Sequence, residues 1–124
     1  MEPEVVVAAL WARIAARDWP GLTALLAPEV RVSWPATGEV FTGPANFVAV
    51  QSEYPEGWEI SVLRIVAQAD VVVSEVEVPH AVLGNTFRAA SFWEVKDGLV
   101  TAATEYWVTL GGEEPADWRR PLAQ

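Results

Sequence analysis

The 124-residue chain contains no cysteine, a single histidine, a single methionine and a single lysine, Lys96. Without cysteine, the chain has no disulfide bonds, no thiolate nucleophile and no thiolate metal ligands. Acidic side chains outnumber basic ones, 17 to 8, and the formal net charge is −9. Because nucleic acids and anionic membrane surfaces are bound mainly through Lys and Arg, the charge disfavours both as partners.

Long hydrophobic segments are also missing from the first part of the chain. The apolar run from Val5 to Ala12 is far shorter than the ~20 residues that span a bilayer. The acidic start of the chain lacks the positive region of a secretory signal. We therefore expect a cytoplasmic protein with no membrane partner, folded as a single domain over residues 1–124, of which residues 111–124 form a polar C-terminal tail.

The chain is rich in apolar residues, at 52%, and in tryptophan, with seven. Val6, Leu10 and Ile14 recur at the spacing of an amphipathic helix. Asp18 is a suitable N-cap for a short second helix, and Gly43-Pro44 opens a third. The sequence predicts three helices in the N-terminal half.

Alternating apolar and polar residues predict strands in the rest of the chain. The first ends at Trp34, and four more follow at about residues 58–67, 71–80, 86–96 and 99–110. Their short separators, including Asp97-Gly98, favour antiparallel neighbours. The pattern predicts an α+β fold with helices packed on one face of a curved antiparallel sheet of four to six strands. A hollow between the helices and the sheet would be a natural small-molecule site.

Several segments resemble the nuclear transport factor 2-like superfamily, which includes SnoaL-like polyketide cyclases and ketosteroid isomerases. The segments are the short helix beginning at Arg17-Asp18, the first strand 27–34, the helix entry 41–44, and the paired strands 91–98 and 105–107. The resemblance implies a cone-shaped fold, also described as a cystatin-like roll, that encloses a pocket. It also implies a homodimer formed through the outer face of the sheet.

The residues that serve ketosteroid isomerases are replaced in this chain. The resemblance puts Trp34 at the position of the general-base Asp and Ser91 at that of the oxyanion-hole acid. The oxyanion-hole Tyr corresponds to Leu10 or Trp11. Indole cannot take a proton from carbon, and a serine hydroxyl is a weak oxyanion donor. Steroid isomerase activity is therefore not expected.

Two residues are the candidates for catalysis. SnoaL-like cyclases carry an acid–base carboxylate on the last strand, and the resemblance brings Glu105 to that position. His80 ends a strand on the same face as Val76 and Val78, and a nearby imidazole would make a workable acid–base couple with Glu105. The alternatives are an ion pair between Glu105 and an arginine, and a hydrogen-bonded edge position for His80.

The remaining candidate site residues would line the pocket: Trp34, Ser91, Trp93 and Trp107. No metal-ligand spacing and no cofactor motif is present, so the expected ligand is a small apolar or aromatic molecule and any catalysis is cofactor-free. The residues leave open whether the protein is an enzyme. One hypothesis is a SnoaL-like cyclase, isomerase or hydrolase that uses Glu105. The other is a non-catalytic dimeric binding or assembly module whose tryptophans fill the core.

Overall fold

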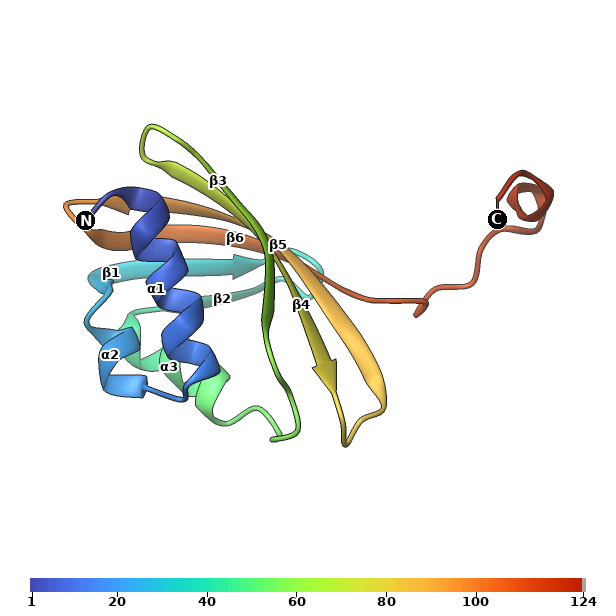
Figure 1. The fold of residues 1–124 in the computed structure, drawn as a ribbon, viewed down its shortest axis with the longest axis horizontal. Helices are drawn as coiled ribbons and strands as arrows, with labels where there is room; N and C mark the ends of the chain where they lie inside the picture. The colour runs from blue at the N-terminus through green and yellow to red at the C-terminus, as the bar shows by residue number, and fades with distance from the viewer. Residues whose placement is uncertain (124) are drawn as a thin grey trace.

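The computed structural model describes residues 1–123 as an α+β fold in which helices cover one face of a curved sheet (Figure 1). This confirms the predicted fold class. The helices are α1 (Pro3–Ala15), α2 (Trp19–Thr23) and α3 (Pro44–Ser52). As expected, Asp18 caps α2, because its side chain accepts a hydrogen bond from the backbone N–H of Gly21 at 3.0 Å.

Six strands form one sheet in the order β2-β1-β6-β5-β4-β3. Their bounds are β1 (Leu26–Trp34), β2 (Glu39–Thr42), β3 (Ser61–Gln68), β4 (Val71–His80), β5 (Asn85–Lys96) and β6 (Leu99–Thr109). The third strand begins later than predicted, since Trp58 makes only an isolated bridge to His80.

One strand pair departs from the expected antiparallel pattern, because β1 and β6 run parallel. The short turns of the sequence specify the pairing of chain neighbours, and β3 to β6 are indeed antiparallel neighbours. β1 and β6 are joined only through β2, α3 and three further strands. Their relative direction is therefore decided by the closure of the whole fold, which no local turn signal records.

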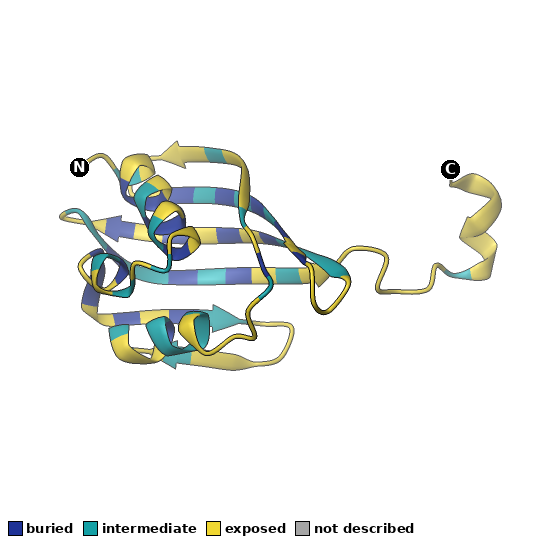
Figure 2. Cartoon of the chain, turned by 60° about the horizontal axis from the view of Figure 1, so that its bottom comes forward, coloured by how far each residue is buried: buried dark blue, intermediate teal, exposed yellow. Residues whose placement is uncertain are grey.

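The core lies between α1 and the inner face of the sheet. Burial alternates along the central strands, with buried positions on the face under the helices (Figure 2). Trp11 of α1 and Trp93 of β5 meet edge to face with ring centroids 5.8 Å apart. Both indole N–H groups donate to Ser74 Oγ, at 3.0 and 2.8 Å. This buried hydroxyl therefore satisfies two tryptophans that would otherwise lack acceptors.

Beyond β6 the chain leaves the body and ends in the short 3-10 helix η1 (Asp117–Leu122), which stands apart in Figure 1. Arg120 pairs with Glu114 and Asp117 of the same segment. Trp118 is 70% exposed, so it does not anchor the tail against the body of its own chain. Among residues 1–123, no helix is long and apolar enough to cross a membrane.

Candidate functional site

A cavity of about 260 Å³ lies between the helices and the sheet, at the end of the sheet where β4 and β5 are joined. Exposed residues of the β1–β2 connection form part of its rim, and buried side chains form its floor. Six of its thirteen lining residues are aromatic, and its wall is mostly apolar. It is lined by Trp11, Trp34, Ala36, Thr37, Glu39, Val50, Gln51, Tyr54, Trp58, Ile60, Val78, Phe87 and Trp107.

The three tryptophans expected to form a pocket wall divide between two environments. Trp34 and Trp107 line the cavity, with ring centroids 6.4 Å apart. Trp93 is fully buried, packs edge to face on Phe47, and does not line the cavity. The interface between helices and sheet is therefore filled by rings at the Trp93 end and hollow at the Trp107 end.

Glu105 lies between the part of this interface that is filled at Trp93 and the part that is hollow at Trp107. Its position on β6 is two residues from Trp107 and two from the buried Ala103, on the inner face of the sheet. The side chain is 1% exposed. Its Oε2 lies 2.6 Å from Ser91 Oγ on β5, and its Oε1 accepts from Trp34 Nε1 on β1 at 3.1 Å. Three neighbouring strands therefore hold one carboxyl group.

Burial raises the pKa of the Glu105 carboxyl above its ordinary value, because the charged form loses its hydration. Hydrogen bonds from Ser91 and Trp34 act in the opposite direction and are outweighed. No arginine or lysine pairs with Glu105 among the ion pairs of residues 1–123, since Arg64 and Arg88 pair with Glu75 and Glu77. The environment thus shifts the equilibrium of the carboxyl toward its protonated form, relative to a carboxyl in water.

The two partners of Glu105 are Trp34 and Ser91, the residues that the sequence resemblance aligns with the general-base Asp and the oxyanion-hole acid of ketosteroid isomerases. In this chain, Trp34 and Ser91 instead direct their donors at a carboxyl on the next strand of the sheet, β6. The strand register explains the contact, because Ser91 and Glu105 are directly opposite each other. The Trp34 indole N–H and the Ser91 hydroxyl are therefore both hydrogen-bonded to the Glu105 carboxyl.

The His80 side chain is hydrogen-bonded to backbone groups and does not contact Glu105. Its Nε2 lies 2.9 Å from the carbonyl oxygen of Pro55, and its Nδ1 accepts from the backbone N–H groups of Val82 and Leu83. A carbonyl only accepts, so the proton resides on Nε2. The register puts His80 six residues along β4 from Ser74, the partner of Ser91, or about 20 Å from the Glu105 region. The expected His80–Glu105 couple is not formed.

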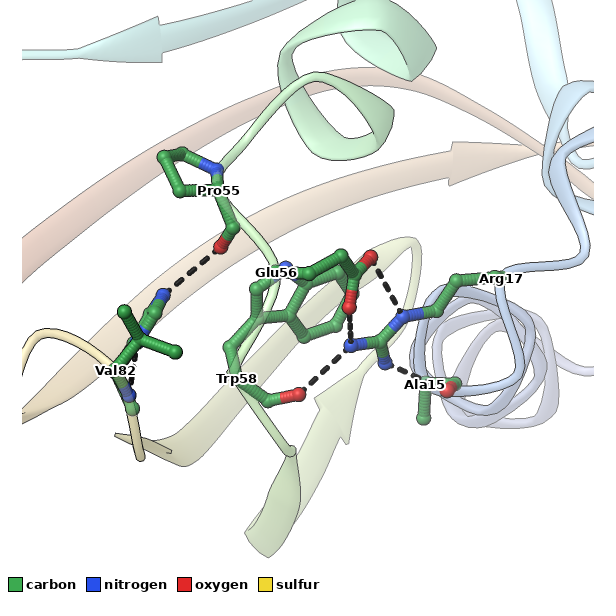
Figure 3. Close-up of polar contacts among 7 residues, drawn as sticks. Ala15, Arg17, Pro55, Glu56, Trp58 and Val82 are labelled. Atoms are coloured by element: carbon green, nitrogen blue, oxygen red, sulfur yellow. Dashed lines mark hydrogen bonds and ion pairs between the residues drawn. The ribbon is translucent and has the colours of Figure 1, made fainter.

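Arg17 packs on Trp58, one of the residues that line the cavity (Figure 3). Its guanidinium lies 3.3 Å from the centroid of the Trp58 ring and donates to the carbonyl oxygen of Trp58. It also pairs with Glu56 at 2.7 Å, and the hydrogen bond from Arg17 lowers the pKa of that carboxyl. These contacts fix the position of Trp58, which lines the cavity.

Sequence reasoning missed several residues of the cavity. The sequence does not predict Trp11, Tyr54, Trp58 or Phe87 as pocket-lining residues, and all four line the cavity. Tyr54 follows α3 and Trp58 precedes β3, so both lie in the connection between these elements. Phe87 carries a usable signal, because it alternates in step with the buried Ala89 of β5. No cluster of three or more potential metal ligands occurs within residues 1–123.

The SnoaL-like domain model matches residues 7–103, and the chain belongs to this family, within the nuclear transport factor 2-like superfamily. A ketosteroid isomerase candidate from Kribbella flavida is 29% identical, with a TM-score of 0.88 over 98% of this chain and 87% of that one. No curated protein sequence matches the chain.

Two further solved structures share the fold at lower identity. A nuclear transport factor 2-like protein of unknown function from Burkholderia xenovorans is 23% identical, with a TM-score of 0.79 and coverage of 98% and 93% of the two chains. An LEH-like epoxide hydrolase from M. tuberculosis is 20% identical, with a TM-score of 0.73 and coverage of 86% and 83%.

Proposed function

We propose that the protein binds an apolar or aromatic small molecule in the cavity between the helices and the sheet. The observation that carries this proposal is an aromatic-lined space of about 260 Å³ beside a packed core. Rings offer stacking area and little competition from water, which favours flat apolar ligands.

Filling the cavity tests the binding proposal. Val50 lines the cavity and is half-buried, so Val50→Trp should occupy the space. We expect titration calorimetry to show tetralin binding to the unaltered protein and at least about tenfold weaker binding to the variant. Val82→Trp is the control, because Val82 is 75% exposed and does not line the cavity. Equal affinity in the Val50 variant, or no binding to the unaltered protein, would overturn the proposal.

We further propose that Glu105 performs acid–base chemistry on the bound molecule. Its raised pKa supports this role, because a carboxyl whose pKa lies closer to neutral pH is better suited both to give and to take a proton. The side chain does not itself line the cavity, whereas the half-buried Trp34 bonded to it does. The proposed role therefore requires the Trp34 ring to move aside, which would break its hydrogen bond to Glu105 and expose the carboxyl to the cavity. The reaction class is isomerisation, cyclisation or hydrolysis without a cofactor.

Glu105→Gln separates catalysis from binding. Glutamine can still accept from Trp34 and hydrogen-bond with Ser91, so the variant should fold and keep its ligand affinity. We expect turnover of enone, epoxide or ester substrates, followed by mass spectrometry, to fall at least about 100-fold. Unchanged turnover would remove the acid–base role and leave the binding proposal standing.

We also propose that two copies associate through the outer face of the sheet. Phe92 of β5 and Tyr106 of β6 are 45% and 49% exposed there and meet edge to face at 6.1 Å. Val71 of β4 and Val108 of β6 are exposed on the same face as further apolar surface. Together they provide an apolar patch of the kind that marks protein–protein contacts.

A further inference from the structure

The C-terminal tail leaves β6 and does not pack on the body of its own chain (Figure 1, Figure 2). Within residues 1–123, no hydrogen bond or ion pair joins residues 113–123 to residues 1–112. The polar contacts of the tail are internal, because Arg120 pairs with Glu114 and Asp117. The tail therefore has a local structure of its own and no support from the body.

The end of the tail exposes side chains of the kinds that anchor protein–protein contacts. Trp118 and Leu122 are both exposed. The guanidinium of Arg119 lies 5.8 Å from the centroid of the Trp118 ring, and Arg119 makes no ion pair within residues 1–123. Tryptophan and arginine are among the residues that dominate the binding energy of protein interfaces. The tail is therefore suited to dock on an apolar surface that lies beside a carboxylate.

A matching surface lies on the outer face of the sheet, at the end where β4 begins. Val66, Val73 and Phe92 are opposite one another across β3, β4 and β5 and form one row. Val71 and Glu94 form the opposite pair two positions further along the same face. Val66, Val71 and Phe92 are exposed, and Glu94 makes no ion pair within the described residues. An exposed apolar row thus lies beside a carboxylate.

The charges at this end of the sheet are complementary to the arginine of the tail. The turns that flank the start of β4 and the start of β6 carry Asp70 and Asp97, both exposed, next to the single lysine, Lys96. Glu75 and Glu77, further along β4, are already paired with arginines. The excess of carboxylates therefore favours docking of Arg119 at the start of β4.

A second copy of the chain brings a tail to this surface. The tail leaves the end of β6, whereas β4 begins at the opposite end of the sheet. To reach the level of Glu94 on its own chain, the tail would run back from Thr109 to Ala102, or about 23 Å. When two copies stack outer face to outer face with their β6 strands in opposite directions, each tail emerges over the start of β4 in the other copy.

The size of stable interfaces also favours a contribution from the tail. Such interfaces use about 20–30 residues from each partner. The tail continues the apolar outer face, because Val108 and Leu110 are exposed between Tyr106 and the tail. Trp118 and Leu122 then extend the apolar contact beyond the end of the sheet.

From these observations we infer that the C-terminal tail of each copy docks on the second copy of the dimer. Trp118 packs on the row formed by the partner's Val66 and the partner's Phe92, and Arg119 pairs with the partner's Glu94. This inference rests on the proposed association through the outer face and names the segment that strengthens it.

Charge reversal in the full chain tests the pairing of Arg119 with Glu94. Arg119→Glu and Glu94→Arg should each raise the dimer dissociation constant, measured by sedimentation, about three- to tenfold. Their combination should restore the constant to within about twofold, because the opposite charges again face each other. Arg119→Glu with Glu59→Arg is the matched control and should restore nothing, since Glu59 is exposed and precedes β3.

Truncation of the tryptophan side chain tests the apolar part of the contact. Trp118→Ala should raise the dimer dissociation constant at least about tenfold. Val82→Ala is the control, because Val82 is exposed in the β4–β5 turn and should not alter the constant.

A spin label shows which chain receives the tail. The sequence has no cysteine, so Ala123→Cys gives a single labelling site at the end of the tail. Spin-labelled chains are mixed with unlabelled 15N chains at a concentration where the protein is dimeric. The label should broaden the amide resonances of residues 66–71 and 92–97 in the 15N chains, which carry no label themselves.

The outcomes separate this inference from the proposed association. Broadening that requires the label and 15N on the same chain would place the tail on its own body and overturn the inference, as would an absence of broadening. A Trp118→Ala dimer with an unchanged dissociation constant, or charge reversals that do not restore each other, would overturn it while the outer-face dimer stood. A monomeric unaltered protein would overturn the association and the inference together.

Discussion

At the scale of single residues, Glu105 is the most consequential side chain. A carboxyl with 1% exposure and no cationic partner among the ion pairs of residues 1–123 is costly when charged. Ser91 and Trp34 supply hydrogen bonds without a compensating charge. These surroundings raise the pKa of the Glu105 carboxyl, and this should be visible in the stability of the protein.

The pH dependence of stability should reveal Glu105 directly. Because its folded-state pKa is raised, the unfolded chain releases this proton at lower pH than the folded protein does. As the pH rises from about 4.3 toward the folded-state pKa, the free energy of unfolding should fall, by at most about 1.4 kcal/mol per pH unit. Below that window the group has no effect, and above it the full penalty remains.

Glu105→Gln removes this dependence. Thermal unfolding across a pH series should show a Tm difference between the variant and the unaltered protein that grows with pH and then levels off. Glu59→Gln, at an exposed position, is the control. A Tm difference between Glu105→Gln and the unaltered protein that is constant with pH would contradict a raised pKa for Glu105.

At the scale of elements, the end of β4 holds the loop that forms one side of the cavity. His80 binds the carbonyl of Pro55 on one side and two backbone N–H groups of the following turn on the other. A Cβ at Gly57 would lie 2.7 Å from the His80 ring, so the loop backbone approaches it closely. The imidazole therefore joins the α3–β3 connection to the β4–β5 turn through hydrogen bonds. These two segments have little regular secondary structure.

Replacing His80 should loosen this side of the cavity. We expect His80→Ala to destabilise the protein by about 2–4 kcal/mol, because three hydrogen bonds are lost at a buried position. Hydrogen exchange should accelerate in residues 53–60 and 81–84, with little change in β5 and β6. Pro79→Ala, at the exposed neighbouring position, is the control. A uniform acceleration of hydrogen exchange across the whole sheet would contradict the inference that His80 stabilises these two connections locally.

At the scale of the whole molecule, the two faces of the sheet have separate roles. The inner face carries the core and the cavity, and the outer face carries the exposed Phe92 and Tyr106 together with ion pairs such as Arg88–Glu77. Substitutions on the outer face can therefore alter association without reaching the cavity.

A charge on the outer face should dissociate the proposed dimer. Tyr106→Asp would bury a carboxylate in the contact, so sedimentation at increasing concentration should show a shift from dimer to monomer. Val82→Asp changes an equally apolar exposed residue in the β4–β5 turn and should leave the association unchanged. Tetralin affinity should be the same in both variants. A monomer in the unaltered protein at all concentrations would exclude the dimer.

The sequence by itself determined the elements and their inward faces. Helical spacing of Val6, Leu10 and Ile14 and the alternation along β4 record local backbone geometry, and all these helix residues are buried. Short turns likewise determined the antiparallel neighbours, because a tight turn leaves the chain few other pairings.

Only the tertiary structure decided how the tryptophans divide and where the polar groups meet. Trp34, Trp93 and Trp107 share one inward pattern, yet α1 and α3 fill the space over Trp93 and leave it open beside Trp107. The contact of Glu105 with Trp34 depends on the parallel pairing of β1 with β6, across residues that are 71 positions apart. Such contacts depend on how the elements close around one another, and no local period in the sequence encodes that closure.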